Sequence, residues 1–420
     1  MKKLIQPGLY ALVVLLAVAC TPEKKPVEGL GPEKDSPTKP EKTHDRYWND
    51  LARYVAGLPA LEGSVLDSLE HRPEAEAQRA FYQSAPWKEY RDYLKKVEAF
   101  AQQEFAPQHQ SDRVMLYPFS GPDFITAYTL FPNAKRYIFW GLEPEGHLPD
   151  VRTLPAARMP HNLQSVQHSL RTIIRRSFFV TSEMGGDFGR AELNGSLPVI
   201  LTFMAERGNE ILEVERIKIN MQGEIEPIGA DSSYAMRAND SLVTGMRYRF
   251  RKSEEAPVQE LVYIVFDAQD FPGDPHFSRH AELVKWLRSQ GTVNTYFKSA
   301  SYLMHWRSTE ALRNLILDIS DFVFQDDTGI RYGFFDQEAW DITLYGNYAR
   351  PVYPFEGQYE TALANAYTQK RHPVKPIGFQ MGYQQGRGED RTSLLIARKK
   401  RPQTNKPAAK PGAEAEKTGK

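Results

Sequence analysis

Residues 114–124 have the sequence VMLYPFSGPDF, which predicts a buried strand, a tight turn and the start of a helix. The first four residues are apolar strand formers, and Ser120 and Gly121 are typical of turns. Pro122 suits the first turn of a helix, where its missing N–H costs nothing. An apolar helical face and a second apolar run at 137–140 follow. Strand, helix and strand in this order predict a parallel unit from which a mixed α/β sheet grows.

The sequence on either side of this unit predicts further strands, with helices between the earlier ones. Residues 246–251 and 258–266 alternate as two strands of an antiparallel hairpin, residues 197–207 favour a helix, and the glycine-rich residues 184–190 favour a loop. With about seven strands in all, the pattern predicts a Rossmann-like, three-layer α/β fold on a mixed sheet. We expect this domain to cover residues 111–398, preceded by a helical lead-in at residues 47–110.

The composition limits the classes of partner. Lys and Arg number 53, as do Asp and Glu, so the formal net charge is zero. A nucleic-acid partner is therefore not expected, because it would need a basic surface. The chain has one cysteine, which rules out a disulfide framework and a cysteine-based metal site. No metal site is predicted.

The first 20 residues have the layout of a secretory signal. A positive start is followed by an apolar run at residues 9–19, which ends in Leu-Ala-Val-Ala before the lone Cys20. This pattern resembles the lipobox of bacterial lipoproteins. The resemblance implies that residues 1–19 are removed and that Cys20 is acylated, so that membrane lipid holds the protein. Thr21, where an Asp would imply retention in the inner membrane, implies the outer membrane.

Polar, charged segments flank the body. Residues 20–46 are rich in Pro, Lys and Glu and nearly free of apolar side chains, so we expect a disordered tether. Residues 399–420 are predicted to be a basic disordered tail. Together these segments place a folded domain at the end of a lipid anchor.

The loop after the first strand has the position of a ligand site. Ser120, Gly121 and Asp123 lie where a doubly wound sheet brings its first loop to a ligand, and Glu143 follows the second strand. Glu143 is 143 − 121 = 22 residues beyond Gly121, against a gap of about 20 for a ribose-binding acid. In this respect the unit resembles S-adenosylmethionine-dependent methyltransferases. Those enzymes usually carry two or three glycines in this loop and this chain has one, so no cofactor is predicted.

Several functions remain open from the sequence. We expect a non-catalytic domain that binds a ligand or partner at the cell envelope, a glycan or a protein, in a crevice that also includes Asp326 at a later strand end. One alternative is a transferase related to the methyltransferases. Another is a hydrolase that uses Ser301 and His305, which would share a face if they lie on a helix. The sequence does not decide whether the protein is an enzyme.

Overall fold

The computed structural model describes residues 46–110, 112–189, 191–229, 243–265, 277–384 and 391–400, without the side chains of 181–182 and 277–280. Cys20, the signal sequence, almost all of the predicted tether and the tail beyond residue 400 lie outside the described residues. The described residues belong to one compact unit.

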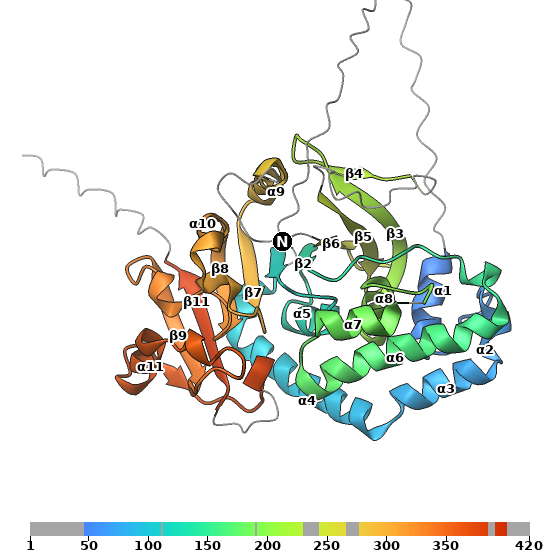
Figure 1. Cartoon of the computed structure of the whole chain (residues 1–420), viewed down its shortest axis with the longest axis horizontal. Helices are drawn as coiled ribbons and strands as arrows, with labels where there is room; N and C mark the ends of the chain where they lie inside the picture. The colour runs from blue at the N-terminus through green and yellow to red at the C-terminus, as the bar shows by residue number, and fades with distance from the viewer. Residues whose placement is uncertain are drawn as a thin grey trace, which may run out of the picture. The chain divides into compact units, whose positions relative to one another are not determined.

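Eleven α-helices lie in the described part of the chain (Figure 1). They are α1 (Arg46–Val55), α2 (Asp67–Glu70), α3 (Pro73–Tyr82), α4 (Ala85–Glu104), α5 (Phe124–Leu130), α6 (Met159–Arg176), α7 (Thr181–Phe188), α8 (Leu197–Glu206), α9 (Phe277–Ser289), α10 (Glu310–Ile319) and α11 (Thr361–Thr368). None of the helices in these described ranges is both long enough and apolar enough to cross a bilayer.

Within the same residues, eleven strands form a single sheet. They are β1 (Val114–Pro118), β2 (Arg136–Gly141), β3 (Glu210–Ile219), β4 (Ile225–Pro227), β5 (Val243–Arg251), β6 (Gln259–Val265), β7 (Val293–Phe297), β8 (Ser320–Asp326), β9 (Trp340–Gly346), β10 (Val374–Lys375) and β11 (Ser393–Lys399). Their order across the sheet is β10-β9-β11-β8-β7-β1-β2-β6-β5-β3-β4.

The centre of the sheet is parallel and its flanks are mainly antiparallel. Strands β8, β7, β1, β2 and β6 run in the same direction, with Leu116 of β1 opposite Ile138 of β2. Strand β11 is antiparallel to both β8 and β9, and β5 is antiparallel to β6 and β3. The predicted mixed α/β fold, the parallel unit around residues 114–141 and the antiparallel hairpin are therefore confirmed.

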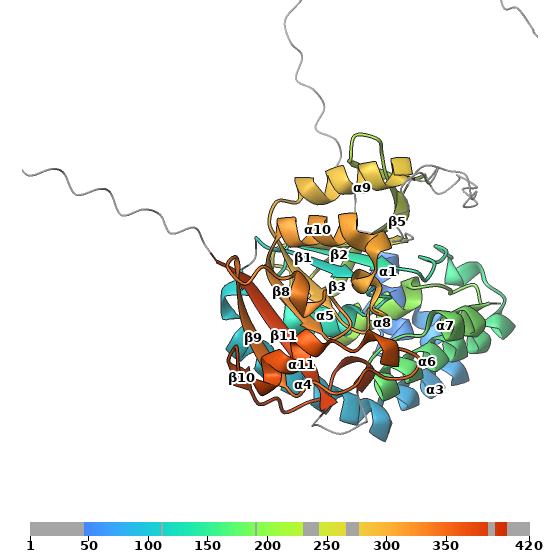
Figure 2. The ribbon, with the colours of Figure 1, turned by 60° about the vertical axis from the view of Figure 1, so that its left-hand side comes forward.

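Helices cover both faces of the sheet. Alternate residues of β1 point to opposite faces, so that Met115 and Tyr117 enter one core while Val114 and Leu116 enter the other. The first core also contains buried residues of α1, α3, α4, α5, α6 and α8, and the second those of α9, α10 and α11. Figure 2 shows α9 and α10 on one side of the strands and α3 and α4 on the other. Burial on both faces explains why β1 and β2 are continuous apolar runs.

Two predictions are wrong: the described residues form eleven strands and not about seven, and one predicted loop is a helix. The residues predicted as a loop, 184–190, belong largely to α7. Two glycines in a helix cost about 1 kcal/mol each relative to alanine. Met184 and Phe188 are nevertheless buried, and α7 packs on α6. Tertiary burial therefore outweighs the local preference that the sequence shows.

Candidate functional site

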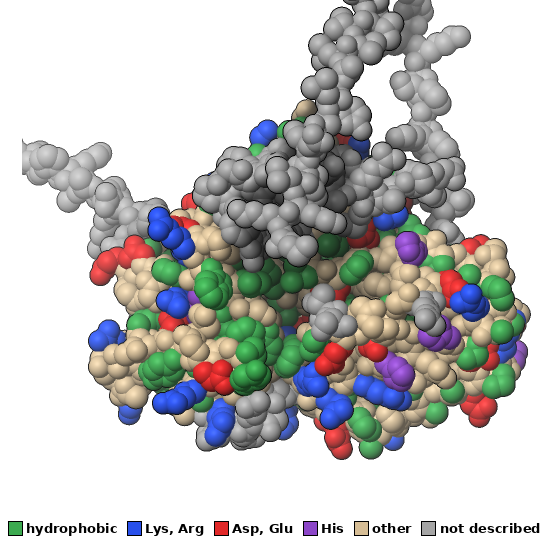
Figure 3. Space-filling view, viewed as in Figure 1, with side chains coloured by type: hydrophobic (Ala, Val, Ile, Leu, Met, Phe, Trp, Pro, Cys, Tyr) green, Lys and Arg blue, Asp and Glu red, His purple; other side chains and the backbone are tan. Residues whose placement is uncertain are grey.

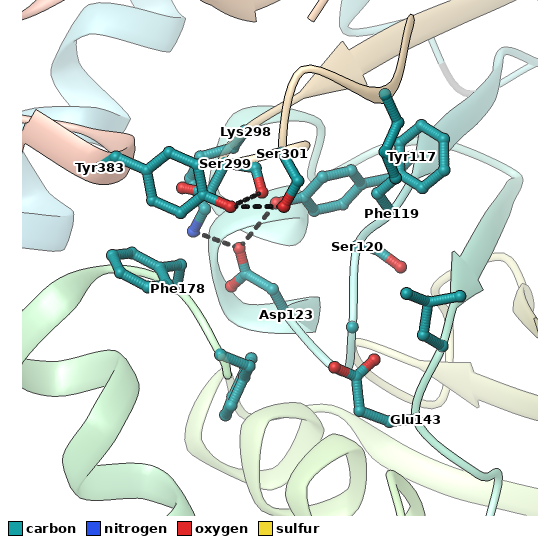
Figure 4. Close-up of a pocket in the computed structure, with 14 residues that line it drawn as sticks. Tyr117, Phe119, Ser120, Asp123, Glu143, Phe178, Lys298, Ser299, Ser301 and Tyr383 are labelled. Carbon is teal, nitrogen blue, oxygen red and sulfur yellow. Dashed lines mark hydrogen bonds and ion pairs between the residues drawn. The ribbon is translucent and has the colours of Figure 1, made fainter. Parts of the chain in front are cut away.

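A pocket opens at the carboxyl ends of β1, β2 and β7. Strand β1 lies between β2 and β7, and the chain adds strands first on the β2 side and later on the β7 side, so the strand order reverses at β1. The volume of the pocket, including the open space at its mouth, is about 540 Å³. In Figure 4 Glu143 lies at one end, Tyr383, Ser299 and Ser301 lie at the other, and Asp123 lies between them. Sheets of this kind bind ligands in such a crevice, at the point where the strand order reverses.

The loop after β1 forms one wall. Phe119 and Gly121 have positive φ values of 59° and 51°, which turn the chain sharply toward α5. The backbone N–H of Ser120 donates to the carbonyl of Trp140 at 2.9 Å, and the Ser120 hydroxyl lies 3.4 Å from the same oxygen. The loop is thereby fixed to β2. Predicted Ser120 and Gly121 both line the pocket.

Glu143 approaches this loop closely. A Cβ at Gly121 would lie 3.4 Å from Glu143 Oε2, and one at Gly141 would lie 3.0 Å from the same atom. The residue is 5% exposed, and its backbone carbonyl accepts a hydrogen bond from the Tyr263 hydroxyl at 2.8 Å. Glycine at 141 therefore leaves room for this carboxylate and for the Tyr263 hydroxyl, whereas a side chain at 121 would be in ordinary contact with the carboxylate.

The floor of the pocket is a buried ion pair. Lys298, directly after β7, places Nζ 2.5 Å from Asp123 Oδ2, and both side chains are at most 2% exposed. The Tyr117 hydroxyl donates to the same Oδ2 at 3.0 Å, while Asp123 Oδ1 caps α5 by accepting the Thr126 N–H at 3.3 Å. Burial, followed by the Asp123 charge, raises the pKa of Tyr117 well above its usual value, so its hydroxyl stays a donor.

The loop after β7 has a strained backbone and is hydrogen-bonded to Asp326. Ser299, Ser301 and Tyr302 have φ values of 54°, 51° and 57°, a region that non-glycine residues rarely adopt. Predicted Asp326 does not line the pocket. Its Oδ2 accepts the Ser299 N–H at 2.9 Å and its Oδ1 accepts the Thr328 N–H at 3.0 Å. Asp326 therefore holds the loop in its strained form.

Aromatic side chains form the rim at the β7 end. The Tyr383 hydroxyl donates to the Ser299 carbonyl at 2.8 Å and lies 2.8 Å from the Ser301 hydroxyl. The Tyr383 ring packs edge-on against Phe178 and stacks on Phe355. Burial raises the pKa of Tyr383 to about 12. Figure 3 shows hydrophobic side chains gathered near the middle of the face it presents, with acidic and basic side chains mixed around them.

The predicted pair Ser301 and His305 is not assembled as a hydrolase would need. Residues 303–305 form a single 3₁₀ turn, and the Ser301 hydroxyl bonds to Tyr383. His305 instead packs against Tyr302, with Nε2 3.7 Å from Glu360 Oε1. Burial and the Arg331 charge lower the pKa of His305 to about 3. The imidazole is therefore neutral at pH 7 and packs against the ring of Tyr302.

Two buried carboxyls beneath the loop predict a dependence of stability on pH. Burial and the Asp326 charge raise the pKa of Asp327 to about 7, and burial raises that of Glu360 to about 7. Between the ordinary pKa range of carboxyl groups and pH 7, these two carboxyls stay protonated in the folded state but lose their protons in the unfolded state. Each group therefore removes up to about 1.4 kcal/mol of stability per pH unit as the pH rises through this window.

We expect Glu360→Gln to gain stability relative to the wild type as the pH rises from 5 to 7.5, measured by urea unfolding. The stability of the variant has to be compared with that of the wild type at each pH. The lowered pKa of His305 makes both proteins more stable as the pH rises toward 6.5, which opposes the effect of Glu360. The exposed Glu356→Gln serves as the control and should leave the pH profile unchanged. A profile for Glu360→Gln parallel to that of the wild type would contradict this assignment.

Sequence reasoning did not commit to Lys298, Tyr117 or Tyr383 as site residues. The signal for Lys298 is a charged residue directly after an apolar strand. Tyr383 had no local signal, because it lies 84 residues from the Ser299 carbonyl it contacts.

Within the described residues no group of three or more metal-ligating side chains converges. No protein-family model matches this chain, and neither the curated proteins nor the solved structures contain a match to it.

Proposed function

We propose that this protein is a bacterial lipoprotein, held in the outer membrane through an acylated Cys20, whose α/β domain binds a nucleoside in the pocket at the carboxyl ends of β1, β2 and β7. The anchor rests on the lipobox resemblance of residues 1–20. The ligand class rests on the strand order, on the position of Glu143 and on the charge of the pocket.

The strand order supports a Rossmann-like arrangement. Numbered along the chain, the parallel strands β6, β2, β1, β7 and β8 have the order 3-2-1-4-5, which begins the order of nucleotide-binding sheets. Strand β11 lies antiparallel between β8 and β9. This placement differs from the sheet of dinucleotide-binding folds and resembles the sheet of S-adenosylmethionine-dependent methyltransferases. This agrees with the resemblance of the first loop and Glu143.

The observation that carries the proposal is the buried Glu143 carboxylate beside Gly121. An acid after the second strand, facing the glycine of the first loop, is placed to accept both hydrogen bonds of a ribose diol. Phe119, Phe178 and Phe179 also line the pocket and offer apolar surface to a base.

The charge of the pocket favours a nucleoside without phosphates. The charged groups among the described lining residues are the carboxylates of Asp123 and Glu143 and the ammonium of Lys298. Two carboxylates against one ammonium disfavour phosphate groups and favour a cationic ligand. S-adenosylmethionine, with its ribose and sulfonium, fits this chemistry, and the same pocket would serve a transferase.

We expect S-adenosylmethionine and adenosine to bind with measurable heat in isothermal titration calorimetry, and ATP to bind more weakly. Glu143→Gln should weaken adenosine binding by about tenfold to a hundredfold, because hydrogen bonds to a charged group contribute about 1.5–3 kcal/mol. The exposed Glu338→Gln is the matched control. Binding of adenosine that is unchanged in Glu143→Gln, or binding of muropeptides alone, would overturn the nucleoside assignment.

A further inference from the structure

A second cavity lies at the opposite edge of the sheet, near the amino ends of β2 and β6. Its walls come from α4, from the turn between α5 and β2, from the end of α8 and from the β5–β6 hairpin. Counted with its open mouth it holds about 860 Å³, more than the pocket at the carboxyl ends of the strands. None of its lining residues belongs to that pocket.

The charge of this cavity is unbalanced. Lys135, Arg207 and Lys252 line it together with a single carboxylate, that of Glu98. Arg207 Nη2 lies 3.5 Å from Glu98 Oε2, whereas within the described residues no carboxylate lies within 4.0 Å of Lys135 or Lys252. Three cations and one anion leave two positive charges in excess, in a chain whose formal net charge is zero.

Two of the cations, Arg207 and Lys252, are also crowded and incompletely bonded. Lys252 Nζ donates to the backbone carbonyl of Arg207, so the ammonium lies against the arginine residue. Partial burial, and then the Arg207 charge, lower the pKa of Lys252, although part of its side chain is exposed. Arg207 Nε is buried and has no hydrogen-bond partner in the described part of the chain. An anion in the cavity would relieve the repulsion and accept the free donor.

The remaining wall is apolar. The Tyr128 ring, Pro132, Pro257 and Val258 line the cavity beside the cations, and Val258 is 43% exposed. An anion alone would leave this wall open to water. A ligand with a charged group and an apolar part would cover both halves.

We infer that this second cavity binds a phosphomonoester with an apolar substituent, its dianion held by Lys135, Arg207 and Lys252. The two excess positive charges match the charge of a phosphomonoester, and a guanidinium beside two ammonium groups offers the donors that phosphate oxygens accept. The same group occurs on soluble metabolites and on lipid headgroups, and the lipoprotein proposed above would meet both.

The test uses the mature chain from residue 20 onward with Cys20→Ser, so that neither the apolar signal sequence nor acyl chains bind the vesicles. Calorimetric titrations with inorganic phosphate and phenyl phosphate measure the soluble arm. Flotation with phosphatidylcholine vesicles, with and without phosphatidic acid, measures the lipid arm. Lys135→Gln/Lys252→Gln removes the two ammonium groups. Lys88→Gln/Lys285→Gln removes two exposed lysines outside the cavity and serves as the matched control.

We expect phenyl phosphate to bind more tightly than inorganic phosphate. The cavity double variant should lose roughly tenfold in affinity per lysine, whereas the control variant keeps its affinity. Flotation that requires phosphatidic acid and both cavity lysines assigns a lipid headgroup, and binding of phenyl phosphate alone assigns a soluble ester. Absence of binding in both arms, or equal binding by the cavity variant with an unchanged melting temperature, would overturn the inference.

Discussion

Replacing Lys298 by methionine is expected to lower the free energy of unfolding by about 3–5 kcal/mol, because the substitution leaves the Asp123 carboxylate buried without its cation. Both side chains are at most 2% exposed, so the few water molecules that reach Asp123 through the pocket replace the lost ammonium only poorly. The Tyr117 hydroxyl and the Thr126 N–H still bond to Asp123, but neither neutralises its charge.

Urea unfolding at neutral pH measures this loss, and a double variant separates its causes. Asp123→Asn in the Lys298→Met background removes the unpaired charge while the side-chain oxygen can still cap α5, so most of the stability should return. Lys285→Met, at an exposed lysine, should change stability by no more than about 0.5 kcal/mol. A loss below about 1 kcal/mol for Lys298→Met would show that the buried pair does not hold the pocket floor.

The part of the site that sequence reasoning found is the part encoded locally. Ser120, Gly121, Asp123 and Glu143 lie within one strand-helix-strand unit, where parallel pairing of β1 and β2 brings both strand ends to the same edge. Their spacing along the chain is then sufficient to place them together. All four line one pocket in the structure.

The rest of the site depends on pairing between distant segments. Lys298 meets Asp123 across 175 residues, because β7 pairs with β1 on the side away from β2. Local patterns show that β7 is a strand but not which neighbour it takes. Asp326 illustrates the same limit. Its position at a strand end is correct, but only the fold shows that its oxygens are already occupied by Ser299 and Thr328.

The largest expected effect concerns the anchor, at a residue that lies outside the described structure. Cys20→Ser should abolish labelling of the protein with a clickable palmitate analogue and remove the protein from the outer-membrane fraction. Each buried methylene contributes about 0.8 kcal/mol, so one acyl chain gives only marginal binding whereas several chains hold a protein firmly. Serine has no thiol to receive the diacylglyceryl group.

Two variants of the next residue test the sorting expectation separately from the anchor. Thr21→Ser should leave both the label and the outer-membrane location unchanged. Thr21→Asp should keep the label but move the protein to the inner membrane, as the lipoprotein resemblance implies. Acylation and sorting are thus independent readouts, and the nucleoside pocket depends on neither. A wild-type chain that takes up no palmitate would overturn the lipid anchor, whereas adenosine binding by the same chain would remain as a separate result.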